Sequence, residues 1–134
     1  MKLIIAGSRD LIVPPSFISS CIHMYDLEPT EIVSGASGQE EDGYNVTHYA
    51  NGIDGCGERW AFDNDLAVRR FSAKFKTLGL KAGPIRNEEM AKYADALLLI
   101  WDGVSRGSLS MRTKMIGKPI YEVVVRTRPT VRYP

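Results

Sequence analysis

The feature that most constrains the fold is an unbroken apolar run, Ala96–Leu97–Leu98–Leu99–Ile100. A strand that faces water on one side alternates apolar and polar residues, whereas this run has no polar position. We therefore predict a strand over residues 95–101 that is buried on both faces, as in a parallel sheet covered by helices on both sides.

Apolar runs and helix-like patterns alternate along the rest of the chain. Phe17, Cys21 and Met24, for example, recur at three- and four-residue spacings, which is typical of an amphipathic helix. The predicted strands span residues 3–6, 31–34, 67–72, 95–101 and 120–125, and the predicted helices span residues 14–27, 53–66, 83–93 and 106–116. This alternation predicts a three-layer, Rossmann-like α/β sandwich with a mainly parallel five-stranded sheet.

The length of 134 residues fits one domain. We assign it residues 1–125, with an insertion at 39–51, followed by a basic tail at 126–134. Hydrophobic residues make up 44% of the chain and charged residues 25%, as in folded soluble proteins, and the net charge of +1 gives no basic surplus for nucleic-acid binding. The tail arginines are expected either to be solvated or to contact an anion or a partner subunit: Arg126, Arg128 and Arg132.

No targeting or membrane segment is expected. The apolar run before Gly7 is too short for a signal peptide, and no segment reaches the roughly 20 apolar residues that cross a bilayer. Cys21 and Cys56 fall on predicted helices, lack a metal-binding spacing and are expected to be small core hydrophobes. These features predict a cytoplasmic protein with reduced cysteines.

Ligands of parallel α/β sheets bind beyond the carboxyl ends of the strands, so the turns that follow the strands are candidates for a binding site. Most of these turns are rich in glycine and serine, which leaves backbone amides open to an anion. Arg9 and Arg86 offer planar guanidinium groups suited to phosphate, although Arg9 can equally be a surface residue beside a glycine turn. The candidate ligand-binding residues are Gly7, Ser8, Arg9, Ser34, Gly35, Ala36, Asp54, Arg86, Asn87, Asp102, Gly103 and Ser105.

Several candidates also have an ordinary structural interpretation. Asp54 and Asp102 can cap the helix or turn in which they lie, instead of meeting a ribose hydroxyl or another ligand group. Arg86 falls in the first turn of a predicted helix, where its charge opposes the helix dipole. A bound anion would remove that conflict, and so would a salt bridge to Glu89 or Asp95.

The candidate turns contain several short motifs in a fixed order. They are Gly7–Ser8–Arg9–Asp10, Val33–Ser34–Gly35–Ala36, Gly52–Ile53–Asp54–Gly55 with Glu58–Arg59–Trp60–Ala61, Gly83–Pro84–Ile85–Arg86–Asn87 with Met90, Ala94–Asp95–Ala96, and Trp101–Asp102–Gly103 with Ser105, Gly107 and Met111. This combination resembles the YspA-like branch of the SLOG superfamily, which also includes the cytokinin-activating LOG enzymes and the DNA-processing protein DprA. The resemblance covers nearly the whole chain up to about Val124.

The resemblance implies a Rossmann-like fold that binds nucleotides or nucleotide-derived ligands at the strand carboxyl ends. Members of the superfamily are often proposed as sensors or processors of nucleotide signals in bacterial and phage conflict systems. The LOG enzymes carry a Pro-Gly-Gly-x-Gly-Thr-x-x-Glu motif whose glutamate serves the hydrolysis of a nucleoside monophosphate. In this chain no carboxylate follows Gly107 until Glu122, which argues against that reaction by that mechanism.

Residues 39–51 interrupt a loop that runs directly between two of these motifs in the family. The acidic side chains and the histidine there have no recognisable metal-ligand spacing, so no metal is expected. We expect a lid over the site or a subunit contact, with Tyr44 and Tyr49 packing on a base or on a partner.

The sequence therefore predicts a protein that binds a nucleotide or nucleotide-derived small molecule, as a sensor or a sequestering protein, with no further cofactor and as a homo-oligomer. The alternative is a hydrolase that cleaves an N-glycosidic or phosphate bond, for which Asp10, Asp54 and Asp102 are the carboxylates on the candidate loops. A third possibility is a protein-interaction domain whose ancestral pocket is empty.

Overall fold

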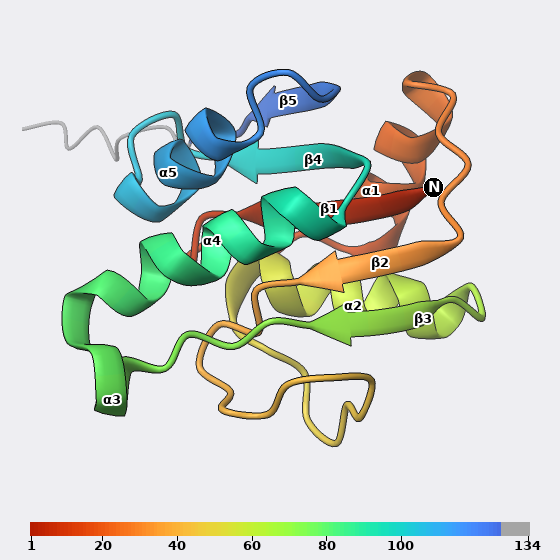
Figure 1. Cartoon of the computed structure of the whole chain (residues 1–134). Coiled ribbons are helices and arrows are strands. Elements are labelled where there is room, and N and C mark those ends of the chain that lie inside the picture. Colours follow the sequence, from red (N-terminus) through yellow and green to blue (C-terminus); the bar gives the residue numbers. More distant parts are fainter. Residues whose placement is uncertain (127–134) are drawn as a thin grey trace, which may run out of the picture.

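The chain forms a five-stranded, all-parallel sheet in the order β3-β2-β1-β4-β5, as the computed structural model shows (Figure 1). The structure describes residues 1–126, so most of the predicted basic tail, including Arg128 and Arg132, lies outside the described residues. The strands are β1 (Lys2–Gly7), β2 (Glu31–Ser34), β3 (Ala67–Arg70), β4 (Ala96–Trp101) and β5 (Ile120–Val124). The predicted Rossmann-like α/β architecture is confirmed.

Helices cover both faces of the sheet (Figure 1). One face carries α1 and α2, and the other carries α4 and α5. The helical elements are α1 (Pro15–Met24), α2 (Gly52–Asp63), α3 (Phe75–Leu78), the short 3₁₀ turn η1 (Gly79–Lys81), α4 (Ala82–Tyr93) and α5 (Arg106–Lys114).

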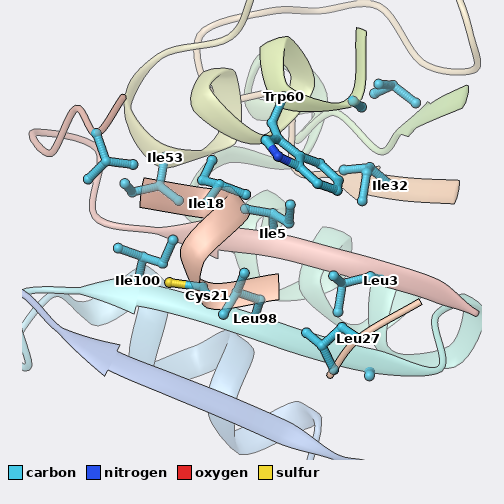
Figure 2. Packing of buried hydrophobic residues seen from close by; sticks show 14 residues of the cluster. Leu3, Ile5, Ile18, Cys21, Leu27, Ile32, Ile53, Trp60, Leu98 and Ile100 are labelled. Carbon is cyan, nitrogen blue, oxygen red and sulfur yellow. The ribbon is translucent and has the colours of Figure 1, made fainter. Parts of the chain in front are cut away.

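The central strands supply apolar side chains to both layers of the core. In β1, Leu3 and Ile5 face α1 and α2, whereas Ile4 and Ala6 face α4 and α5. Figure 2 shows the first of these layers, in which Trp60 of α2 lies over the sheet. All six residues of β4 are buried, so the prediction of a strand covered on both faces is confirmed.

The segment before α4 differs from the prediction. The short elements α3 and η1 were not expected, because none of their residues is buried and no apolar stripe marks them. Helix α4 also begins at Ala82, so Arg86 lies in its second turn. The predicted conflict between Arg86 and the first turn of the helix was therefore wrong.

The insertion at 39–51 lies along the outer edge of β3. Gly43 forms an isolated antiparallel bridge with Arg70, and the amide of Ser72 donates to Asp42 Oδ1 at 2.7 Å. Strand β3 itself ends at Arg70, two residues before the predicted end at residue 72. The insertion thereby covers backbone groups that a bare edge strand would expose.

The remaining structural predictions concern the membrane and the cysteines. Within residues 1–126, none of the helices combines the length and the apolar character needed to cross a bilayer. Cys21 is buried in the core beneath α1, as predicted, and Cys56 is partly buried beside the same core.

Candidate functional site

A cavity of about 300 Å³ lies at the carboxyl ends of β1, β2 and β4, and we call it the inner cavity. Its walls come from the turns that follow these strands and from the first turns of α2 and α5, together with α4. Its lining includes nine of the predicted ligand-binding residues: Gly7, Ser8, Arg9, Gly35, Asp54, Arg86, Asn87, Asp102 and Ser105. The fold thus brings together side chains that lie up to about 100 positions apart in the sequence.

Arg86 and Asp54 face each other across Gly35. A Cβ atom at Gly35 would lie 3.0 Å from Arg86 Nη1 and 3.0 Å from Asp54 Oδ2, so only glycine leaves both groups their space. Arg86 donates to the carbonyl of Gly35 through Nη1 and to Asn87 Oδ1 through Nε. Asp54 Oδ2 accepts a bond of 3.1 Å from the amide of Ser37. Backbone contacts therefore hold both charged groups in place.

Burial shifts the pKa values of Asp54 and Arg86 toward their neutral forms, and the attraction between their charges offsets only part of that effect. Burial raises the pKa of Asp54 to about 6, against the opposing effect of the Arg86 and Arg9 charges. Burial also lowers the pKa of Arg86 below its ordinary value, although the nearby Asp54 opposes that effect. Among residues 1–126, Arg86 makes no ion pair with Asp54, Glu89 or Asp95. Its guanidinium therefore remains available to an anion in the cavity.

The turn after β4 is held by Asp102 and Ser8. Asp102 Oδ1 accepts the amides of Val104 and Ser105 at 2.9 and 2.8 Å, and these bonds hold the pKa of Asp102 below its usual range. The hydroxyl of Ser8 accepts the amide of Asp102 at 3.0 Å and lies 3.3 Å from Ser105 Oγ. Asp102 thus caps the turn, which was one of its two predicted roles.

The start of α5 opens into the inner cavity. Ser105 is the N-cap residue, and the first amides of a helix have no intrahelical partner and carry partial positive charge. Ser108 also lines the cavity, is only 5% exposed, and its Oγ has no hydrogen-bond partner within the described chain. A buried hydroxyl without a partner is costly, so this end of the cavity favours a ligand that accepts or donates hydrogen bonds there.

A second cavity of about 470 Å³, the outer cavity, adjoins the inner one. Four residues line both cavities: Arg9, Ser37, Asn51 and Arg86. The other walls of the outer cavity come from the start of the insertion and from residues 73–77. Of the residues that line the outer cavity, the predicted ligand-binding set included Arg9, Ala36 and Arg86 but none from residues 73–77, because the α3 segment carries no motif that marks it.

Comparison with known proteins found no protein family, no curated protein and no solved structure that matches the chain. The function of the cleft formed by the two cavities is therefore inferred from its own geometry and chemistry.

Three predicted site residues lie outside the inner cavity. Ser34 is fully buried and donates to Glu58 Oε2 at 2.8 Å, so it supports the fold. Gly103 has a φ of 86° and forms the turn after β4 without lining either cavity. Ala36 lines the outer cavity. Successive residues of a glycine-rich turn face different directions, which the sequence alone does not resolve.

The structure shows what two further predicted site residues, Asn87 and Asp54, contact within the chain. The amide of Asn87 joins α4 to α5, because Nδ2 lies 3.3 Å from both Gly107 O and Ser110 Oγ, while Oδ1 accepts from Arg86. Asn87 therefore positions Arg86, and its role as a ligand-binding residue stays a prediction. Asp54 binds the amide of Ser37 in the preceding loop, and so it is not the cap of its own helix.

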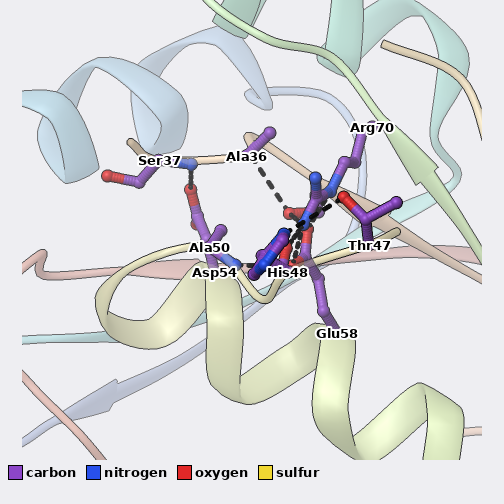
Figure 3. Close-up of polar contacts among 9 residues, drawn as sticks. Ala36, Ser37, Thr47, His48, Ala50, Asp54, Glu58 and Arg70 are labelled. Carbon is purple, nitrogen blue, oxygen red and sulfur yellow. Dashed lines mark hydrogen bonds and ion pairs between the residues drawn. The ribbon is translucent and has the colours of Figure 1, made fainter. Parts of the chain in front are cut away.

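Beside the cleft lies a closed ion pair between Glu58 of α2 and Arg70 of β3 (Figure 3). Both side chains are 0% exposed, and Arg70 contacts both carboxylate oxygens at 2.7 Å. Glu58 also accepts the hydroxyl of Ser34 and the amide of Ala50, each at 2.8 Å. The carbonyl of His48 accepts from Arg70 Nη2. The pair thereby ties the insertion to α2 and to the loop after β2.

The predicted roles of the insertion can be compared with its contacts. Tyr44 lies away from both cavities, where its hydroxyl is 3.2 Å from that of Tyr93, and Tyr49 lines a separate groove beside α2. Glu40 and Gln39, in contrast, line the outer cavity. Within the described residues, no group of three or more acidic, histidine or cysteine side chains is arranged to hold a metal.

Proposed function

We propose that the chain binds the phosphate of a nucleotide-derived small molecule in the inner cavity. The observation that carries this proposal is the convergence of Arg86, Arg9 and the start of α5 on one cavity of about 300 Å³. Guanidinium groups and helix N-termini are both suited to phosphate, because they combine positive charge with several hydrogen-bond donors. The unpartnered hydroxyl of Ser108 supplies a further group for a phosphate oxygen.

The motif resemblance to the YspA-like branch of the SLOG superfamily supports the same ligand class. The nine predicted residues that line the inner cavity belong to the motifs shared with that branch or directly follow them. In this proposal the protein recognises the ligand without transforming it, and so serves as a sensor or as a protein that sequesters a nucleotide signal.

A second candidate function is hydrolysis of a bond in the same ligand, and Asp54 is the observation that favours it. A carboxyl group with a pKa near 6 at the wall of a ligand cavity is suited to general acid–base chemistry near neutral pH. Of the three carboxylates predicted for that role, Asp102 is engaged by two turn amides and Asp10 is exposed. Asp54 is therefore the candidate acid or base.

One experiment separates the two candidates. The purified protein is incubated with a panel of nucleoside mono-, di- and triphosphates, heated to release ligand, and the small molecules are identified by mass spectrometry. Unchanged nucleotide, together with a raised melting temperature, supports binding, whereas new products that disappear in Asp54→Asn support hydrolysis. A ligand present at one hundred times its Kd is expected to add about 2.7 kcal/mol to the free energy of unfolding.

A further inference from the structure

The outer cavity differs from the inner cavity in the chemistry of its walls. Both cavities have polar and charged lining residues, but the outer one also presents the aromatic ring of Phe75 with Ala36 and Ala73, whereas the apolar residues that line the inner one are Ala6, Met90 and Met111. The phenyl ring of Phe75 belongs to a residue that is 52% exposed, on a short helix with no buried residue. An aromatic residue that is exposed at the wall of a cavity offers a flat apolar surface to a ligand.

The wall that carries Phe75 is held in place by contacts with the insertion. Lys74 Nζ lies 2.6 Å from Asp42 Oδ2, and Lys76 Nζ lies 3.0 Å from Glu40 Oε1. The hydroxyl of Ser72 donates to the carbonyl of Glu40 at 2.9 Å. These contacts join residues 40–42 to residues 72–76 on both sides of Phe75. Two segments that the sequence separates by about 30 residues thus form one rim of the outer cavity.

The sizes of the cavities set a limit on what fits. Ligand pockets typically occupy roughly 300–1,000 Å³, so the inner cavity alone is at the lower end of this range. The outer cavity adds about 470 Å³ and adjoins the inner one, with which it shares Arg9 and Arg86 as lining residues. A ligand that fills the cleft therefore has an anionic part beside these arginines and a flatter, less polar part beside Phe75.

We propose that the outer cavity is a base subsite, in which the heterocyclic base of a nucleoside phosphate stacks on Phe75 while its phosphate occupies the inner cavity. This inference rests on the proposed function, since the phosphate in the inner cavity fixes where the base lies. The amide side chain of Gln39 lines the same wall and supplies a donor and an acceptor for the edge of the base. The insertion contributes to recognition through residues 39 and 40, while Tyr44 and Tyr49 lie elsewhere.

The test compares nucleotides with a phosphate ligand that lacks a base. Isothermal titration measures the Kd of ribose 5-phosphate and of the adenosine, guanosine, cytidine and uridine 5′-monophosphates. At least one nucleotide is expected to bind at least tenfold more tightly than ribose 5-phosphate, and Phe75→Ala is expected to remove most of that difference, on the order of tenfold. The Kd of ribose 5-phosphate is expected to stay unchanged in Phe75→Ala.

Two matched variants make the outcome decisive. Phe62→Ala removes another exposed phenyl ring, which lines a different groove, and is expected to leave every Kd unchanged. Phe75→Tyr is expected to retain the preference for the nucleotide. The base subsite is rejected if no nucleotide binds more tightly than ribose 5-phosphate, or if Phe75→Ala leaves the preference intact. If Arg86→Ala alters neither ligand, or if none of the five compounds binds, the proposed function fails together with the subsite.

Discussion

Helix α2 carries two acidic residues one turn apart, and each faces an arginine, yet the two pairs differ in almost every other respect. Glu58 and Arg70 contact each other directly, and neither side chain is exposed to solvent. The carboxylate oxygens of Glu58 also accept hydrogen bonds from the hydroxyl of Ser34 and the amide of Ala50. Asp54 and Arg86 form no direct ion pair and line a cavity. The first pair is enclosed by the fold, whereas the second borders a cavity, where we propose that it receives a ligand.

The loop after β2 accounts for much of this difference. Ser34 points into the closed pair and donates to Glu58, whereas Gly35, the next residue, has no side chain and leaves room above it for Arg86 and Asp54. Both oxygens of Glu58 accept hydrogen bonds, and both side chains are 0% exposed, so a ligand has no access to this pair even though Arg70 Nη1 has no hydrogen-bond partner among the described residues. A pair that is held apart by backbone contacts beside a cavity remains accessible to a ligand, at the cost of stability.

The largest effect on stability is expected when the ion pair between Glu58 and Arg70 is broken. Glu58→Gln leaves the guanidinium of Arg70 buried without a counter-charge, so we expect the free energy of unfolding to fall by about 3–5 kcal/mol. Urea denaturation followed by circular dichroism measures the change. Arg86→Met is the matched variant on the open pair and is expected to cost less than about 1 kcal/mol. An equal loss of stability in the two variants would remove the distinction between the pairs.

The next effect concerns ligand binding by the open pair. Arg86→Ala removes charge-assisted hydrogen bonds worth about 1.5–3 kcal/mol, so a nucleoside phosphate should bind roughly ten- to a hundredfold more weakly. Titration calorimetry gives the Kd. Arg59→Ala serves as the control, because Arg59 is exposed on the same helix α2 and lines neither cavity. A normal Kd in Arg86→Ala, with the fold intact, would show that the phosphate lies elsewhere.

The third prediction uses the pKa of Asp54, which burial raises from 3.8 to about 6. Above pH 6 the Asp54 carboxylate competes with an anion for Arg86, and below pH 6 it is neutral. We therefore expect the affinity for sulfate, whose charge is constant in this range, to rise several-fold between pH 7.5 and pH 5. Asp54→Asn should bind sulfate tightly throughout, with a flat pH profile.

The same titration affects stability. Because the pKa of Asp54 is higher in the folded chain than in the unfolded chain, its ionisation destabilises the fold as the pH rises from about 4 to 6. Asp54→Asn lacks this contribution, so the difference in melting temperature between the variant and the wild type should widen across that interval. A constant difference would show that the Asp54 carboxyl titrates normally.

The smallest effect is expected from removal of the Ser108 hydroxyl. Ser108→Ala removes a buried hydroxyl that has no protein partner, so the unliganded protein should keep its stability or gain slightly. Loss of one hydrogen bond to phosphate, worth about 0.5–1.5 kcal/mol, should weaken nucleotide binding by about fivefold. Thermal unfolding and titration calorimetry measure the two quantities. Reduced stability without ligand would indicate that the hydroxyl has a structural role.

Much of this arrangement could be predicted from the sequence, because its signals are local. The apolar run at 96–100 specified a strand buried on both faces, and the alternation of strands and helices specified the parallel sheet. The rule that ligands bind at strand carboxyl ends then predicted that Arg9, Arg86 and Asp54 lie close together, and all three line the inner cavity.

The features that escaped prediction depend on contacts between distant segments. Arg70 interrupts an apolar strand, and this is the only local hint that it meets a buried carboxylate; its partner Glu58 is specified by the fold. Ser34 and Gly103 belong to turns of the right composition, but composition does not say which residue of a turn faces the cavity. The outer cavity was missed because Phe75 lies in a segment without periodicity.

The most direct test of the central claim is a crystal structure of the protein grown with tungstate, a phosphate analogue whose tungsten atom gives a strong anomalous signal. We predict an anomalous peak in the inner cavity, within hydrogen-bonding distance of the Arg86 guanidinium and the first amides of α5, and none beside Glu58 and Arg70. An inner cavity without tungstate, in which Arg86 instead forms a direct ion pair with Asp54, would contradict the account.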